Sequence, residues 1–158
     1  MKQTRTRRRI TAGLAALAVA TALPVVTASP AQAAPYCADG IQVGGDIERT
    51  YLHMGGPGGA LGCPLTVELV NPDQHGRRQQ FEHGTVYWSA GTGAFPVWGY
   101  IGDYWCASLG CERGTVGYPT SYEYRVGGEI RQNFQCGVIH FQDLGGGTSR
   151  TWHTYICD

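Results

Sequence analysis

The feature that most constrains the fold of this chain is an internal repeat. Sliding the sequence against itself aligns two stretches of about 54 residues. The matched positions are Ile47, Gly56, Leu61-Gly62-Cys63-Pro64, Glu68, Arg78-Gln79, Phe81, Gly84, Val86, Trp88 and Trp98, which align with Ile101, Gly110, Val116-Gly117-Tyr118-Pro119, Glu123, Arg131-Gln132, Phe134, Gly137, Ile139, Phe141 and Trp152. A repeat of this length is usually one supersecondary unit that buries its apolar face against a neighbour. We therefore expect repeat one at about residues 47–98 and repeat two at about residues 101–152.

Each copy predicts a short helix that is followed by a turn. Asp46 is a good N-cap, apolar residues follow it at helical spacing, and Gly55 supplies the stop. The second copy predicts a helix over residues 101–109 that ends at Gly110.

After the turn, each copy predicts an extended stretch and a β-hairpin. Pro64 fixes the backbone on entry to the extended stretch. Two β-prone runs flank His83-Gly84, which predicts a hairpin. Alternation places Val86 and Trp88 on one face and Tyr87 on the other. The expected class is α+β with disulfide staples, and the alternative is an all-β repeat domain.

The first 33 residues predict a secretory signal peptide. Basic residues precede an apolar run from Ile10 to Val26, and Ala31-Gln32-Ala33 supplies a cleavage site. The apolar run is shorter than the ~20 residues that a spanning helix needs, so we expect no membrane span in the mature form. The residues from Thr6 to Ile10 resemble a twin-arginine signal, and the sequence leaves both export routes open.

The mature chain, residues 34–158, is long enough for a single domain with a modest core. It carries 7 Arg and no Lys against 12 Asp plus Glu, a formal charge of about −5. An acidic balance without a basic stripe argues against nucleic-acid binding and against attachment to anionic membranes.

All six cysteines lie in the mature chain. An even count in a small secreted protein indicates three disulfides, for which 15 connectivities exist. One pair flanks a turn-like Ala-Ser-Leu-Gly, a second joins the N-terminal cysteine to the next one along the chain, and the third is the remainder. The first expected pair is Cys106–Cys111; for the other four cysteines we suggest Cys37–Cys63 and Cys136–Cys157, and the sequence leaves their connectivity open. The spacings disfavour a zinc site, and we expect no metal and no cofactor.

The repeated motifs resemble the LGFP repeat. The resemblance rests on the two tetrads Leu61-Gly62-Cys63-Pro64 and Val116-Gly117-Tyr118-Pro119, on the Thr and Glu that follow each, and on Arg77 to Trp88. It covers nearly the whole mature chain. Members of this family are exported proteins of actinobacteria, in which LGFP arrays often follow a hydrolase or mycoloyltransferase domain and are thought to attach it to the cell envelope. The resemblance thus implies a secreted, extracellular or cell-wall-associated protein whose partner is an envelope glycan or another cell-wall component.

This sequence departs from the family pattern in three ways. Cys63 replaces the aromatic residue of the tetrad, no enzyme domain is visible, and there are two repeats rather than a longer array. We therefore expect association with envelope polysaccharide and not the anchoring of an enzyme. Because arrays usually need at least three units, self-association through an open end is an alternative to stabilisation by disulfides.

Two Glu–Arg pairs recur in both copies, Glu68 with Arg78 and Glu123 with Arg131. Each pair is either a polar contact for a sugar or an internal ion pair between the extended stretch and the hairpin, and we favour the ion pair.

Aromatic residues supply the other candidates for a ligand site. Those expected to stack on sugar rings are Tyr87, Tyr100, Tyr122 and Tyr124. The matched pairs expected in the core are Trp88 with Phe141 and Trp98 with Trp152.

An enzymatic function is disfavoured. The sequence holds no nucleophile motif, and the acid–base pair that it suggests, Glu82 with His83, is absent from the second copy. The expected function is therefore a non-catalytic association with envelope polysaccharide. The alternatives are a secreted inhibitor or protein-interaction module, with loops at residues 71–76 and 145–149, and a small secreted hydrolase.

Overall fold

The computed structural model describes residues 34–157, so the predicted signal peptide lies outside the described residues. Within this range, neither helix is long and apolar enough to cross a membrane. A short ladder of β1 (Ala34–Pro35) and β2 (Gln42–Val43) comes first.

Two successive halves then follow the same order of elements. The first half contains α1 (Gly45–His53), η1 (Gly56–Gly58), β3 (Leu69–Val70), β4 (Gly76–Phe81), β5 (Gly84–Ser89) and β6 (Gly93–Val97). The second half contains α2 (Gly99–Leu109), η2 (Cys111–Arg113), β7 (Tyr124–Val126), β8 (Glu129–Phe134), β9 (Gly137–Gly145) and β10 (Thr148–Tyr155). Each half forms a four-stranded antiparallel sheet in sequence order, which we call the first and the second sheet. The mixed α+β class is confirmed.

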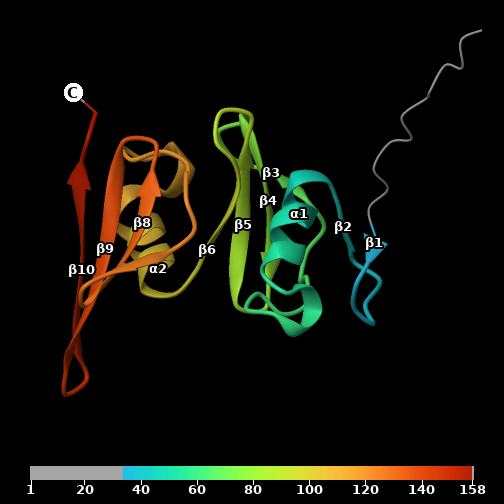
Figure 1. Ribbon diagram of the computed structural model, residues 1–158. Helices are drawn as coiled ribbons and strands as arrows, with labels where there is room; N and C mark the ends of the chain where they lie inside the picture. Colours follow the sequence, from blue (N-terminus) through green and yellow to red (C-terminus); the bar gives the residue numbers. More distant parts are fainter. Residues whose placement is uncertain (1–33, 158) are drawn as a thin grey trace, which may run out of the picture.

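The helices and sheets alternate as layers (Figure 1). Helix α1 covers one face of the first sheet, and α2 lies between the opposite face of that sheet and the second sheet. Each interior has its own core. The first contains Val43, Ile47, Tyr51, Leu61, Phe81, Val86 and Ala94, and the second contains Val97, Ile101, Trp105, Val116, Phe134 and Ile139.

The helix boundaries differ slightly from the predictions. Helix α1 begins after Gly44, so Asp46 is not the N-cap but lies in the first turn, where a carboxylate is favoured by the helix dipole. The predicted stops are confirmed, because Gly55 and Gly110 adopt left-handed conformations with φ of 97° and 86°.

Both predicted hairpins are present, and alternation assigns their faces correctly. Val86 and Trp88 pack in the first core, towards α1, whereas Tyr87 packs against the second core, towards α2. The fourth strand of each sheet, β6 and β10, was not predicted, because glycine-rich turns precede both strands and mask their short alternation.

The match of Trp98 with Trp152 is wrong. Tyr87 pairs with Phe95 across β5 and β6, whereas His140 pairs with Trp152 across β9 and β10. Tyr87 and His140 occupy the same place in the two halves, so Trp152 corresponds to Phe95. Trp98 is instead the N-cap of α2 and packs against the first core.

A buried glutamine ties each half together in the same way. Gln79 and Gln132 are both fully buried, and each side-chain Nε2 donates to two carbonyls. The acceptors are Gln42 at 2.8 Å and Thr66 at 2.8 Å for the first, and Pro96 at 2.7 Å and Ser121 at 2.9 Å for the second. Each glutamine thus joins the segment before the helix, the extended stretch after the proline, and the hairpin. The alignment of the two repeats had paired Gln79 with Gln132, but it did not predict that they link these three segments.

The tetrads also make matching contacts. One buried aromatic residue of each helix donates to the tetrad glycine carbonyl, Tyr51 to Gly62 at 2.9 Å and Trp105 to Gly117 at 3.2 Å. Gly62 and Gly117 have φ of 72° and 69°, and a Cβ would collide with the side chain of Glu82 at the first and of Gln135 at the second. Glycine is therefore required here by backbone conformation and by space.

All three expected disulfides are present: Cys37–Cys63, Cys106–Cys111 and Cys136–Cys157. Cys63 fastens the first tetrad to the N-terminal segment. At the matching position, the Tyr118 hydroxyl donates to Asp73 at 2.6 Å and accepts from Asn71 at 3.0 Å. The two residues thus perform the same task, which is to fasten a tetrad to the part of the chain that precedes it.

Candidate functional site

A groove of about 810 Å³ runs between the first sheet and α2. Its aromatic lining consists of Tyr87, Trp98 and Trp105, and its polar lining includes Gln80, His83, Thr85 and Asp103. The groove exists because two layers meet along it, one from the hairpin of the first half and one from the helix of the second.

The aromatic wall of the groove is held rigidly. Tyr87 meets Trp105 edge to face, with ring centroids 4.8 Å apart. Trp105 is fully buried and is fixed by its bond to the Gly117 carbonyl. Burial raises the pKa of the Tyr87 phenol, so this hydroxyl stays neutral near neutral pH.

Trp98 closes the end of the groove where α2 begins. Its indole Nε1 donates to the Glu123 carboxylate at 3.1 Å. Burial raises the pKa of Glu123 above its ordinary value, and the bond from Trp98 opposes that change in part. The indole plane is thus oriented by a carboxylate of the second half.

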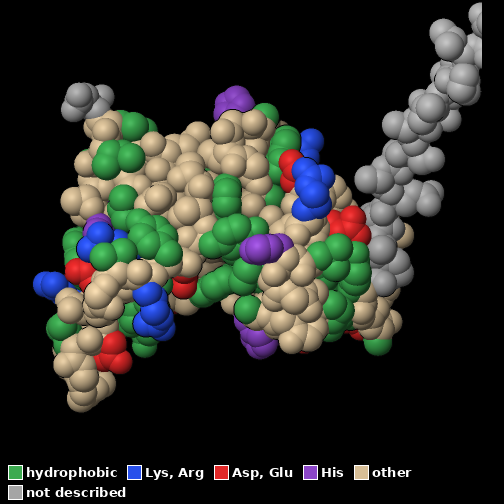
Figure 2. Space-filling view, in the orientation of Figure 1, with side chains coloured by type: hydrophobic (Ala, Val, Ile, Leu, Met, Phe, Trp, Pro, Cys, Tyr) green, Lys and Arg blue, Asp and Glu red, His purple; other side chains and the backbone are tan. Residues whose placement is uncertain are grey.

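This combination suits a ligand with both apolar and hydroxylated faces. Aromatic rings can pack against the C–H face of a sugar, while the amide, hydroxyl and carboxylate groups of the polar lining exchange hydrogen bonds with its hydroxyls. Charged side chains do not gather into one patch on the face shown in Figure 2, where arginines lie at both ends of the molecule.

The expected ion pair between Glu68 and Arg78 is wrong. The Glu68 carboxylate lies 3.4 Å from Nε of Arg77. Arg78 instead donates to the Val70 carbonyl at 3.1 Å and to Asn71 at 3.2 Å. The reason is strand alternation: Arg77 pairs with Trp88 and faces α1 as Glu68 does, whereas Arg78 faces the other way.

The expected ion pair between Glu123 and Arg131 is wrong for the same reason. Arg131 pairs with Tyr124 on the sheet surface that faces away from α2, whereas Glu123 is one position earlier and points towards α2. Arg131 donates from Nε to Glu129 at 2.8 Å.

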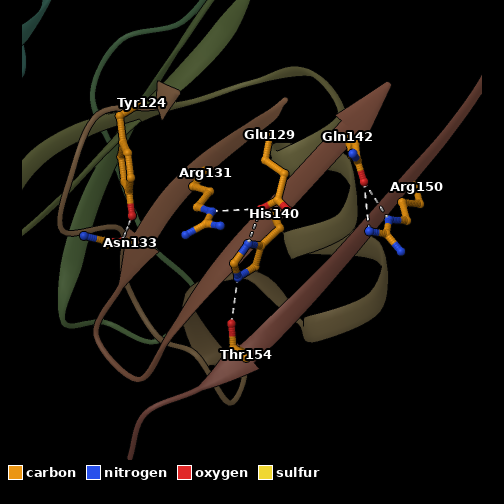
Figure 3. Close-up of polar contacts among 8 residues, drawn as sticks. All are labelled: Tyr124, Glu129, Arg131, Asn133, His140, Gln142, Arg150 and Thr154. Atoms are coloured by element: carbon orange, nitrogen blue, oxygen red, sulfur yellow. Dashed lines mark hydrogen bonds and ion pairs between the residues drawn. The ribbon is translucent and has the colours of Figure 1, made fainter. Parts of the chain in front are cut away.

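The side of the second sheet that faces away from α2, here called the outer face, carries a hydrogen-bonded polar network (Figure 3). His140 connects Glu129, 3.1 Å from its Nδ1, to the Thr154 hydroxyl, 2.7 Å from its Nε2. Bonds from His140 and Arg131 lower the pKa of Glu129. Trp152 stacks on His140 at 4.9 Å. These side chains satisfy one another and lie against the sheet.

Two candidate residues, Tyr124 and Arg131, lie on the outer face. The Tyr124 hydroxyl donates to Asn133 at 2.8 Å. The sequence analysis did not identify His140 as a candidate. Its position matches that of Tyr87, which packs against α2, and the exchange of a tyrosine for a histidine with two polar ring atoms could have indicated a polar surface in the second half.

The remaining tyrosines lie elsewhere. Tyr100 is 61% exposed and stacks on Phe141 at 4.6 Å. Tyr122 packs between Phe95 at 5.4 Å and His53 at 5.0 Å. Of the eight candidates, Tyr87 lines the groove itself, and Glu123 acts on it through Trp98.

The suggested acid–base pair does not assemble. The Glu82 carboxylate accepts from the backbone N–H of Cys63 at 2.9 Å, and His83 lines the groove. Within residues 34–157, no group of three or more His, Cys, Asp or Glu side chains is arranged to hold a metal ion.

Comparison with known proteins identifies the segment that builds the groove. Residues 61–114 match the family model of the LGFP repeat. This segment runs from the first tetrad through the first sheet and α2, so it contains every residue that lines the groove. A comparison with curated proteins gives no match. The chain therefore contains an LGFP repeat at residues 61–114.

Proposed function

We propose that this chain is a secreted, non-catalytic protein of two LGFP repeats that associates with cell-envelope polysaccharide through the groove between the first sheet and α2. The observation that carries the proposal is the lining of the groove, in which the half-buried rings of Tyr87 and Trp98, backed by the fully buried Trp105, lie beside uncharged and acidic polar groups. The whole lining falls within the segment that matches the family.

The proposal of two repeats is supported by contacts that recur between the halves. The buried glutamines, the bonds to the tetrad glycines and the order of elements are shared. The second tetrad also bonds to the first half through Tyr118, which makes the two units one packed body.

Export to an oxidising compartment is supported by the three disulfides, because structural disulfides persist mainly in secreted proteins. Such a compartment is also where an envelope polysaccharide is accessible. The residues of the predicted signal peptide are consistent with this route.

The groove suggests a direct test with purified cell walls. Ala107 is exposed on α2 and lines the groove, whereas its neighbour Ser108 is exposed on the same helix outside the lining. Ala107→Tyr inserts a bulky side chain into the groove without removing a contact, and Ser108→Tyr is the matched control. We expect the wild type and Ser108→Tyr to sediment with the walls and a clearly smaller fraction of Ala107→Tyr to do so.

The fold of each variant is checked by near-ultraviolet circular dichroism. A wild-type chain that retains its fold and does not sediment with walls contradicts the proposal and favours the alternative of an inhibitor or interaction module. The loop at residues 71–76 would then be less suited to carry the contacts than the loop at residues 145–149, because Asn71 and Asp73 are already bonded to Tyr118.

A further inference from the structure

A second hollow, of about 350 Å³, lies on the other side of the first sheet, where α1 begins. It is lined by Gly45, Asp46, Ile47, Glu68, Arg77 and Trp88. The first turn of α1 supplies one wall, and the α1-facing side of strands β4 and β5, with the residue before β3, supplies the other.

The side chains of this hollow are ordered but remain accessible. The indole Nε1 of Trp88 donates to the Asp46 carboxylate at 2.8 Å, which fixes the ring. Nε of Arg77 lies 3.4 Å from Glu68, and the two side chains are 42% and 45% exposed. An indole, two carboxylates and a guanidinium thus converge on a space that solvent reaches.

The second half contains the same hollow in an apolar form. Its volume is about 150 Å³, and its lining is Trp98, Gly99, Tyr100, Ile101, Glu123, Ile130 and Phe141. At the places of Asp46, Arg77 and Trp88 it has Tyr100, Ile130 and Phe141, and Glu123 is engaged by Trp98. Since this half builds the same frame without those polar groups, the frame does not require them in the first half.

We propose that the hollow beside Trp88 binds one pyranose residue of a neutral polysaccharide, as a second sugar site distinct from the groove. The inference rests on the proposed function, because it takes its ligand class from there. The indole receives the C–H face of the ring, while Glu68 and Asp46 accept from its hydroxyls and Arg77 donates to them.

The charges in the hollow favour a hydroxylated ligand over an ion. An anion would meet the two carboxylates of Asp46 and Glu68, and a cation would meet Arg77 and also Arg49, which pairs with Asp46. A sugar hydroxyl both donates and accepts, so it can bond a carboxylate and a guanidinium together. The groove and this hollow lie on opposite sides of the first sheet, so the chain engages polysaccharide at two separate points.

The indole N–H signals of the four tryptophans separate the two sites in a ¹H–¹⁵N correlation spectrum. Trp88 reports on the hollow, Trp98 and Trp105 report on the groove, and Trp152 on the outer face serves as a reference. The probes are the methyl pyranosides of glucose, galactose and mannose, and soluble oligosaccharides released from purified cell walls. We expect at least one probe to shift the Trp88 signal and to leave Trp152 unchanged.

The outcomes distinguish the hollow from the groove. If Trp98 and Trp105 shift and Trp88 does not, the hollow is no sugar site and the proposed function stands. If Trp88 shifts alone, the hollow is supported and the groove is not. If no probe shifts any of these signals, the second sugar site is overturned, and the wall sedimentation assay decides the proposed function separately.

Two substitutions test the chemistry while preserving the fold. Arg77→Ile reproduces Ile130 of the second half, and Glu68→Gln removes one charge without changing shape. We expect each to weaken sugar binding at Trp88 by about tenfold, because a bond to a charged group is lost. Arg150→Gln, on the outer face, is the control that leaves binding unchanged. Wild-type affinity in Arg77→Ile and Glu68→Gln overturns the inference.

Discussion

The two sheets present equivalent surfaces to different surroundings. In the first sheet, Tyr87 and Val97 point towards α2 and pack in the second core. In the second sheet, the same places hold His140 and Thr154, which point outwards and bond to each other. No helix or strand of the described chain covers this outer face (Figure 1). The same fold thus uses apolar residues where another layer follows and a satisfied polar network where none does.

The N-terminal end is closed in a different way. Tyr36 meets Tyr51 edge to face at 5.3 Å, as Tyr87 meets Trp105 at the next layer. The Tyr36 hydroxyl also bonds Glu48, which raises the pKa of Tyr36 to about 12. The short segment before α1 therefore takes the place of a preceding sheet. Repeat proteins need terminal units with polar outer surfaces. Within residues 34–157, the Tyr36–Glu48 contact and the polar network of the outer face lie at the two ends of the layered structure.

The largest loss of stability is expected from a substitution in the core between the first sheet and the second sheet. Trp105→Ala removes a fully buried ring between the two sheets and should lower the free energy of unfolding by about 3–5 kcal/mol. Trp152→Ala, on the outer face, should lower it by about 1 kcal/mol or less. Urea unfolding of both variants measures the difference. Equal losses would show that the outer face is also an interior surface.

The next largest loss of stability is expected on removal of the disulfide that fastens the N-terminal segment, Cys37–Cys63. Replacing Cys37 and Cys63 by Ser opens a link with a sequence separation of 26, whereas Cys106 and Cys111 are separated by 5. Chain entropy predicts losses of about 3.5 and about 2 kcal/mol. Thermal unfolding of the two double variants tests the order. A larger loss for the Cys106–Cys111 variant would contradict the view that the first link closes an end.

A smaller effect is expected at the contact between the halves. Tyr118→Phe removes bonds to Asp73 and Asn71 and should cost about 1–3 kcal/mol. Tyr124→Phe removes one exposed bond on the outer face and should cost about 0.5 kcal/mol or less. Denaturant midpoints of the two variants give the comparison, and it fails if Tyr124→Phe is the more damaging of the two.

The smallest effect is a pair of opposite pH dependences. Burial alone would raise the pKa of Asp73, but bonds from Tyr118 and from the His75 backbone lower it below 3.8. Its contribution to stability is present above that value and is lost as pH falls through the folded pKa. The pKa of Glu123 is raised above 4.5, so its contribution is present below 4.5 and is lost as pH rises through the folded pKa.

Urea midpoints measured between about pH 3 and pH 6 test both signs. Asp73→Asn should flatten the acidic side of the profile, and Glu123→Gln should flatten the decline above pH 4.5. Variants that both keep the wild-type profile would show that neither carboxyl is coupled to folding.

The features that depend on residues close together in the sequence were predicted correctly. The glycine stops at Gly55 and Gly110, the hairpins, the inward and outward faces of β5 and the disulfide Cys106–Cys111 follow from neighbouring residues. The other two disulfides agree with the suggested pairing, but the sequence left that pairing open. The Glu–Arg pairs were wrong because a match along the sequence ignores alternation, and one residue moves an arginine to the opposite face.

The site was less predictable because two segments distant in sequence build it. Tyr87 was a candidate, but Trp98 and Trp105 were assigned to the core or left unassigned, since only the packing of α2 on the first sheet places them beside it. Of the residues that line the hollow beside Trp88, the sequence analysis had named Glu68 as a candidate for ligand binding. It did not name Arg77, because the second half has Ile130 at that position and the comparison of the two repeats therefore does not align the two residues.

We propose that the groove between the first sheet and α2, and not the outer face, binds envelope polysaccharide. The most direct test of this proposal is the dissociation constant for soluble cell-wall polysaccharide, measured by calorimetry for the wild type, Ala107→Tyr and Trp152→Ala. We expect Ala107→Tyr to weaken binding by at least about tenfold, and Trp152→Ala to bind as the wild type does. Loss of binding in Trp152→Ala with full binding in Ala107→Tyr would contradict it.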